Sequence, residues 1–166
     1  PVGLLNIGTV IINFFYLWKM YASKDYFTIL PISSNTQYLE YFLNFYKKDI
    51  ANYLATDAID VSQSAISFYI LRNAMPSGLF VCSRYDDSTL KIDLDYVIPA
   101  YRDFQIGKYV FRNRKELFLD KGFTKLRTAT CNEMHSRYLV KMGFVRKEML
   151  SDGKTSCFEI DQAKKR

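Results

Sequence analysis

The chain has 166 residues, 49% of them hydrophobic, with a net charge of +6 at pH 7. This length normally makes one domain with a full core, and the basic balance suits a nucleic acid, an anionic membrane surface or a polyanionic cofactor. The three cysteines lack C-x-x-C spacing and His135 is the sole histidine, which argues against a dedicated zinc site. Scattered cysteines in odd number fit reduced thiols in a cytosolic compartment.

The first 22 residues differ in character from the rest. Residues 2–18 carry no charge, and this run is about as long as a membrane span of roughly 20 residues requires. Asn6 and Asn13 count against a span, because amides are costly in lipid unless another helix pairs with them. Residues 1–22 therefore either end a membrane span or form an apolar helix that packs on the domain or on a second copy.

Residues 23–162 predict one α+β domain, and residues 163–166 a frayed basic tail. Strand-like runs of β-branched and aromatic residues alternate with runs of helical periodicity. The expected elements are a strand at 26–32, helices at 37–54 and 57–64, strands at 65–72, 79–85 and 89–98, a helix at 108–121, a strand at 125–131, a helix at 133–142, and strands at 145–150 and 156–160.

The most informative stretch is D-L-D-Y-V-I-P-A-Y-R-D-F-Q-I-G-K, residues 93–108. A β-like alternation ends at Pro99, a short turn carries Gly107, and a helix-like run begins at Lys108. A strand that feeds a tight loop and a helix start offers backbone N–H groups to an anion, helped by the helix dipole. This arrangement predicts a phosphate cradle, and hence an enzyme that binds a phosphorylated cofactor.

The same stretch resembles the GNAT acyltransferases, whose pattern is close to V-x-P-x-Y-R-G-x-G-I-G-K. A second segment, N-E-M-H-S-R-Y-L-V-K-M-G-F at residues 132–144, resembles the GNAT helix that opens on Asn and ends in Lys-x-Gly-Phe. The resemblance covers residues 24–161. It implies a GNAT-like, mixed, mostly antiparallel central sheet flanked by helices, with the apolar helix at 1–22 as an N-terminal addition.

The resemblance also implies acetyl-CoA, or another acyl-CoA, as cofactor. In the family, strand amides before the loop align the pantetheine arm and loop amides hold the pyrophosphate. Two positions depart from the pattern, because Gln105 and Asp103 each stand where the family usually has glycine. A positive φ at Gln105 would cost about 1 kcal/mol, and Asp103 adds a negative charge beside the expected pyrophosphate. Asn132 binds the pantetheine or merely caps its helix. The implied cofactor-binding residues are Val97, Ile98, Arg102, Asp103, Phe104, Gln105, Ile106, Gly107, Lys108 and Asn132.

The acid that protonates the leaving thiolate is harder to assign. Many GNAT members carry a tyrosine seven residues after the helix-opening Asn, and that position is Leu139 here. Tyr138 sits one residue earlier, about 100° around the helix, so we expect it to face elsewhere. His135, one turn before Leu139, is the alternative acid. Both side chains also have a purely structural interpretation.

The base is expected on the strand before the loop. Asp93 and Asp95 point the same way as Val97 if the alternation is regular, and a carboxylate with a raised pKa could deprotonate an ammonium. The alternative is a solvated strand face.

The sequence thus predicts an acyl-CoA-dependent N-acyltransferase that transfers an acetyl group to an amine by direct attack. The alternative is a degenerate GNAT domain that binds CoA or a protein partner without catalysis. Nucleic acid is not an expected partner, because the basic residues cluster at the cofactor loop. The expected location is cytoplasmic, with a tether to the bacterial inner membrane, since residues 1–22 resemble the last hydrophobic helix of YgjV-type inner-membrane proteins. Neither the acceptor nor the oligomeric state follows from the sequence.

Overall fold

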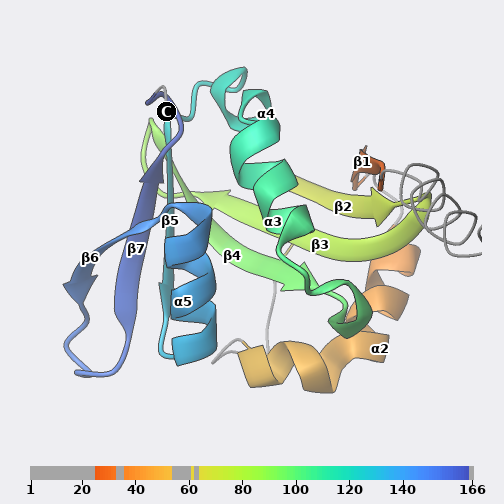
Figure 1. Ribbon diagram of the computed structural model, residues 1–166, viewed down its shortest axis with the longest axis horizontal. Helices are drawn as coiled ribbons and strands as arrows, with labels where there is room; N and C mark the ends of the chain where they lie inside the picture. The colour runs from red at the N-terminus through yellow and green to blue at the C-terminus, as the bar shows by residue number, and fades with distance from the viewer. Residues whose placement is uncertain (1–24, 33–35, 54–60, 62–63, 165–166) are drawn as a thin grey trace, which may run out of the picture.

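The structure is a computed structural model that describes residues 25–32, 36–53, 61 and 64–164 (Figure 1). The apolar helix expected over residues 1–22 lies outside this part of the chain, as does most of the short helix expected over 57–64. Among the described helices, none combines the length and the apolar character that crossing a membrane demands.

Seven strands form one sheet in the order β1-β2-β3-β4-β5-β7-β6. Every neighbouring pair is antiparallel except β4 and β5, so the expected mixed, mostly antiparallel sheet is confirmed. The strands are β1 (Phe27–Pro31), β2 (Ile66–Arg72), β3 (Met75–Arg84), β4 (Thr89–Val97), β5 (Lys125–Thr130), β6 (Val145–Met149) and β7 (Ser156–Asp161).

The β2–β3 hairpin is tighter than the sequence suggested. The second strand of the hairpin was expected over residues 79–85, but β3 already begins at Met75. The turn consists of Asn73 and Ala74, which both have positive φ, at 53° and 65°. Two such residues match the right-handed twist of the flanking strands, which is why a two-residue loop suffices.

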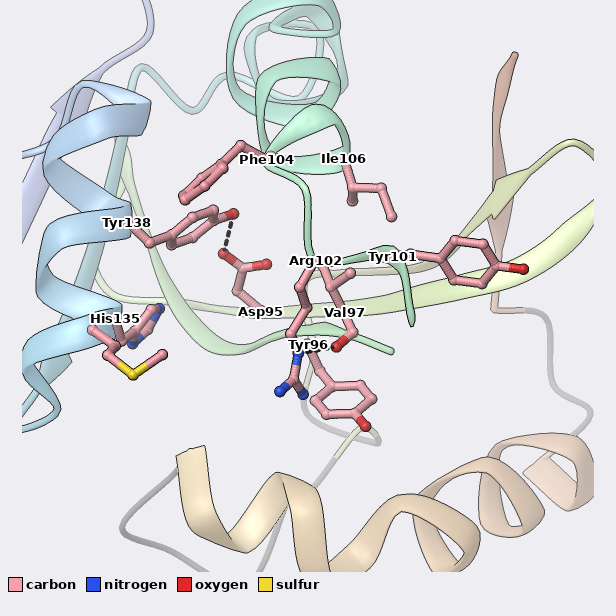
Figure 2. A pocket seen from close by; sticks show the side chains of 11 residues that line it. Asp95, Tyr96, Val97, Tyr101, Arg102, Phe104, Ile106, His135 and Tyr138 are labelled. Carbon is pink, nitrogen blue, oxygen red and sulfur yellow. Dashed lines mark hydrogen bonds between the residues drawn. The ribbon is translucent and has the colours of Figure 1, made fainter. Parts of the chain in front are cut away.

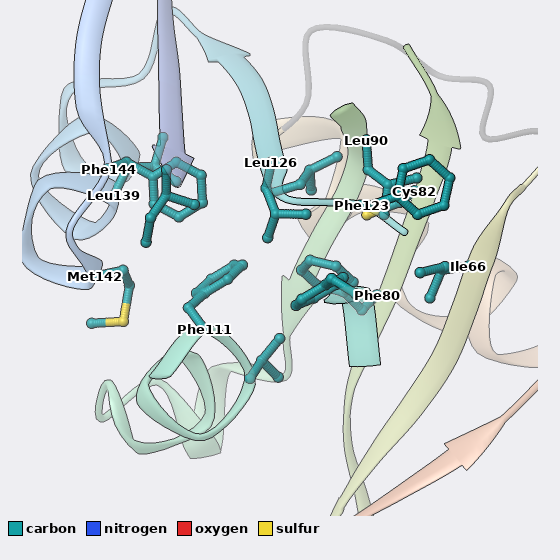
Figure 3. Packing of buried hydrophobic residues seen from close by; sticks show 14 of the residues in the cluster. Ile66, Phe80, Cys82, Leu90, Phe111, Phe123, Leu126, Leu139, Met142 and Phe144 are labelled. Atoms are coloured by element: carbon teal, nitrogen blue, oxygen red, sulfur yellow. The ribbon is translucent and has the colours of Figure 1, made fainter. Parts of the chain in front are cut away.

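Helices cover both faces of the sheet, and Figure 1 shows α2 on one side of the strands and α4 on the other. One core cluster joins the sheet to α2, and the other joins it to α3, α4 and α5. Figure 3 shows part of the second cluster, with Phe80 of β3 beside Phe111. The described helices are α2 (Thr36–Tyr53), α3 (Gln105–Lys108), α4 (Glu116–Leu119) and α5 (Glu133–Met142), with a π-helical turn at Tyr109–Asn113.

The single helix expected over residues 108–121 is not continuous. It begins three residues earlier, at Gln105, passes through the π-helical turn and is interrupted at Arg114, where φ is −122°. The π turn carries two consecutive core residues, Val110 and Phe111, which are both 1% exposed. These β-branched and aromatic residues have only moderate helix propensity, and tertiary packing decides their local conformation.

Strand β4 changes sides halfway along its length. Val81 of β3 pairs with Leu94 whereas Cys82 pairs with Ile92, so Asp93 is an extra residue, the mark of a β-bulge. Before the bulge Ile92 packs in the cluster beneath α3 to α5, and after it Leu94 packs in the cluster beneath α2. The bulge therefore resets the alternation on which the orientation of Asp93 and Asp95 depends.

The two parallel strands separate soon after they meet. Only residues 89–91 of β4 pair with β5, through residues 125–127. Beyond that point residues 94–97 pair with β3 and residues 128–130 with β7. A wedge therefore opens between the ends of β4 and β5, and the loop before α3 lies at its mouth.

The core can be tested with a matched pair of Phe→Ala substitutions. Phe80 is fully buried, and its ring stacks on the Phe68 ring with centroids 5.1 Å apart, whereas Phe45 on α2 is 81% exposed. Phe80→Ala should lower the free energy of unfolding by about 3–5 kcal/mol, and Phe45→Ala by less than about 0.5 kcal/mol. Urea denaturation measures both, and equal losses would contradict the assignment of Phe80 to the core.

Candidate functional site

A pocket of about 190 Å³ lies at the wedge, between the end of β4, the loop that follows it, and α5 (Figure 2). Most of the side chains that the sequence pointed to line it. These are Asp95, Val97, Arg102, Phe104, Ile106, Gly107, His135 and Tyr138. The other predicted residues, Asp93, Ile98, Asp103, Gln105, Lys108 and Asn132, do not line it.

Asp95 and Tyr138 form the centre of the pocket. The Tyr138 hydroxyl donates a hydrogen bond of 3.0 Å to Asp95 Oδ2 (Figure 2). Burial raises the pKa of Asp95 to about 6, and the bond from Tyr138 only partly offsets it. Burial and the neighbouring carboxylate raise the pKa of Tyr138 well above its usual value. The pair therefore joins a carboxyl that titrates close to neutral pH with a phenol that stays protonated.

The expectation that Tyr138 faces away from the site was wrong. Leu139, at the position of the family's tyrosine, is 1% exposed and packs in the core with Met142. The step of about 100° between neighbours then turns Tyr138 toward β4 rather than away from it. On α5, position 139 therefore faces the core and position 138 faces the pocket, whereas the motif spacing implied that position 139 would face the site.

The two strand carboxylates do not share one site. Asp93 is the extra residue of the β4 bulge and forms an ion pair with Lys91, whose Nζ lies 3.0 Å from Asp93 Oδ1. Asp95 alone reaches the pocket. The bulge breaks the period of two on which the predicted common orientation rested.

His135 supports Tyr138 from below. The residue is 8% exposed, and its ring stacks on the Tyr138 ring with centroids 5.8 Å apart. Burial lowers the pKa of His135 to about 4, so the imidazole is neutral at neutral pH. A neutral imidazole is a poor general acid, and its stacking on Tyr138 is a packing contact.

Arg102 turns away from the loop toward α2. Its Nε donates to the Val97 carbonyl oxygen at 2.8 Å, and its guanidinium forms an ion pair with Asp49. Asp49 also accepts a 2.8 Å bond from the Tyr96 hydroxyl. Figure 2 shows the guanidinium beside the Tyr96 ring. The charge predicted to face a pyrophosphate is therefore engaged elsewhere, and so is the Val97 carbonyl.

The left-handed residue of the loop is Phe104, with φ at 67°, and not Gln105, which begins α3. Conformations of this kind cost a non-glycine residue about 1–3 kcal/mol. Asp103 stabilises the turn, because its Oδ1 accepts the Gln105 N–H at 3.1 Å and its Oδ2 accepts from Arg72 at 2.7 Å. The carboxylate of Asp103 thus lies against the first amide of α3.

The remaining predicted residues have simple roles. Asn132 caps α5 by accepting the His135 N–H at 3.1 Å, which needs no ligand. The Ile98 N–H donates to the Ser77 carbonyl at 2.9 Å, so β3 already uses it. Lys108 is exposed beside the loop.

Sequence reasoning missed several residues of the site. Tyr96, Tyr101 and Met134 line the pocket, and all three lie inside the stretches that carried the motifs. Asp49 and Arg72 hold the loop from α2 and β2. No motif marks these two, and only the tertiary fold brings them to the loop.

No protein-family model and no curated protein sequence matches the chain. Solved structures do resemble it. Ard1 from Thermoplasma volcanium is 19% identical, with a TM-score of 0.63 over 81% of this chain and 97% of that one. A GNAT family acetyltransferase from Elizabethkingia anophelis with acetyl-CoA bound is 19% identical, with a TM-score of 0.58 over 83% and 99%. Spermidine N-acetyltransferase from Vibrio cholerae, in complex with CoA and spermine, is 12% identical, with a TM-score of 0.62 over 82% and 96%.

These likenesses show that the chain has the GNAT acetyltransferase fold, as the two motifs implied. At such low identity they show the fold alone. The resemblance of residues 1–22 to YgjV-type membrane proteins gains no support from them, and those residues lie outside the described part of the chain.

The raised pKa of Asp95 makes a prediction about stability. Since its folded pKa of about 6 exceeds the ordinary value of 3.8, the native state holds the proton that the unfolded state releases. Asp95 therefore lowers the free energy of unfolding as pH rises from about 4 to about 6, by up to about 3 kcal/mol. Asp95→Asn should remove this pH dependence. The free energy of unfolding of the variant, relative to that of the wild type, should therefore increase as pH rises.

Urea denaturation of both proteins at several pH values from about 4 to about 7 measures this gain. His135, with its lowered pKa, gives the opposite trend, but it is present in both proteins and cancels in the difference. A difference that stays constant with pH would show that Asp95 titrates normally.

Proposed function

We propose that the chain is an acyl-CoA-dependent N-acyltransferase that moves an acetyl group from acetyl-CoA to an amine by direct attack. The observation that carries the proposal is the hydrogen bond between Asp95 and Tyr138 in the pocket at the β4–β5 wedge. Two solved structures of the same fold are described with acetyl-CoA or with CoA and spermine.

Acetyl-CoA would supply an acetyl group already activated as a thioester. Asp95 is suited to accept a proton from the acceptor's ammonium, because its pKa of about 6 lies near neutral pH. Tyr138 is suited to release its phenolic proton toward a thiolate, since its hydroxyl lies in the same pocket. The two groups touch, so the proton that Asp95 gains can replace the one that Tyr138 gives up. One hydrogen-bonded pair then serves as both base and acid.

The pocket walls fit the apolar part of a pantetheine arm. Phe104 and Ile106 line one side, and Tyr96 and Met134 also border the pocket. The first turn of α3 adds amide N–H groups that have no acceptor within a helix. The Lys141 ammonium lies 4.0 Å from the Phe104 ring centroid and brings a cation to the loop. These features support cofactor binding at residues 102–108.

A second candidate function rests on Asp103 and Arg102. The Asp103 carboxylate occupies the Gln105 N–H, and Arg102 is held by Asp49. Both contacts weaken the loop as an anion site. They favour the degenerate domain in the form that keeps the fold and the pocket, binds a protein partner rather than acetyl-CoA, and does not catalyse.

A thermal-shift titration of the full chain with acetyl-CoA tests binding first. Cofactor at about 100 times Kd should stabilise the fold by about 2.7 kcal/mol, seen as a rise in Tm. If millimolar acetyl-CoA leaves Tm unchanged, the transferase proposal fails and the degenerate domain is the better description.

Catalysis by the pair is tested with Asp95→Asn and Tyr138→Phe. Each should lower kcat by about 10²–10⁴-fold while acetyl-CoA affinity changes little, because general acid–base catalysis contributes that much. Asp87→Asn and Tyr85→Phe are the matched controls, since both residues are exposed outside the pocket. Undiminished turnover in both pocket variants, across a panel of amines, would contradict the assignment.

The loop charge gives a separate prediction. Asp103→Gly removes a carboxylate beside the first amide of α3 and restores the family's usual glycine, so it should tighten acetyl-CoA binding by about tenfold or more. Isothermal titration calorimetry compares it with the wild type and with Asp87→Asn, which removes the same charge elsewhere. Unchanged affinity would mean that Asp103 does not oppose the cofactor. Binding only by Asp103→Gly would favour the degenerate domain.

A further inference from the structure

Gly107 faces α5 at very short range. A Cβ built on this residue would lie 2.5 Å from the Tyr138 hydroxyl oxygen, 2.9 Å from Tyr138 Cε2 and 2.7 Å from Met142 Sδ. Carbon contacts below about 3.0 Å are repulsive, so any side chain at 107 would force Tyr138 or Met142 to move.

The backbone of Gly107 does not itself demand glycine. The positive-φ glycines among the described residues are Gly122, Gly143 and Gly153, and Gly107 lies within α3. Glycine in a helix costs about 1 kcal/mol relative to alanine. What glycine supplies at 107 is therefore space, and the side chain that fills the space is Tyr138.

Tyr138 has little freedom to give way. Its ring stacks on His135 with centroids 5.8 Å apart and on Phe104 with centroids 6.1 Å apart. Its hydroxyl bonds to Asp95 at 3.0 Å. Met142, the other neighbour of the space, is fully buried. A methyl group at 107 would therefore act first on the hydroxyl, which lies closest to it.

We propose that Gly107 is a positioning residue for the Asp95–Tyr138 pair: it leaves the space through which the Tyr138 hydroxyl reaches Asp95. The catalytic meaning of this inference rests on the proposed function. The sequence motif gave Gly107 a different role, close approach of the backbone to a pyrophosphate. In this chain the close approach is made by the protein's own tyrosine.

The arrangement also accounts for the tyrosine's unusual place in the helix. From position 138 the side chain must cross the start of α3 to reach β4, and it does so where residue 107 carries no side chain. The absence of a side chain at 107 and the presence of a tyrosine at 138 therefore depend on each other.

The pKa of Asp95, measured by carbon NMR titration of its carboxyl group in the full chain, tests the inference without any cofactor. Tyr138→Phe should raise this pKa by about one pH unit, because it removes a hydrogen bond that favours the ionised form. Gly107→Ala should raise it by a similar amount. The double variant should match Tyr138→Phe alone, because both changes remove the same bond. Val140→Ala, at an exposed site on α5, is the control that leaves the pKa unchanged.

Two results would overturn the proposal: a wild-type pKa in Gly107→Ala, or shifts that add in the double variant. If Gly107→Ala is too unstable to titrate, the same substitution is made in two backgrounds, the wild type and Tyr138→Ala, and the decrease in Tm is compared. Tyr138→Ala lacks both tyrosine atoms nearest to position 107. The loss must be smaller in the Tyr138→Ala background, and an equal loss sinks the inference. Acetyl-CoA binding and turnover do not enter these measurements. Failure of the transferase proposal is therefore seen separately.

Discussion

The short contact between β4 and β5 is the constraint from which the site follows. The strands pair over residues 89–91 and 125–127 and then part, each held by its other neighbour. Had pairing continued, the backbone at Asp95 would pair with β5, and no gap could open between the two strands. Because it stops, the end of β4 and the side of α5 approach each other across a gap, and side chains from both converge there (Figure 2).

The protein fills much of this gap with its own groups. Tyr138 crosses it to Asp95, Phe104 stacks on Tyr138, and Asp103 covers the first amide of α3. Each contact links two walls of the pocket, and a ligand that entered would have to loosen or rearrange it. The affinity for such a ligand would be the balance between the contacts it gains and those that the chain already makes with itself.

Most of the fold could be predicted from the sequence because local patterns carried it. The alternation in β4 and the Asn cap of α5 are local features, and the two motifs fixed the order of elements. The predictions of side-chain orientation failed where a single residue shifts the periodicity of a strand or a helix. Of the two carboxylates expected on one side, only Asp95 lines the pocket after the bulge at Asp93, and packing of Leu139 turned Tyr138 into the pocket. Arg72 and Asp49 could not have been found, because only tertiary structure brings them to the loop.

Because of the bulge at Asp93, β4 contributes side chains to both hydrophobic core clusters. Its first half belongs to the cluster under α3, α4 and α5, and its second half to the cluster under α2. Neither helical layer can therefore detach without disturbing the strand that anchors the other, which ties the two halves into one cooperative unit. The same bulge also decides which face of the sheet the Asp95 side chain lies on. If β4 instead alternated regularly through Asp93, Asp95 would face the α2 core and Tyr96 the pocket.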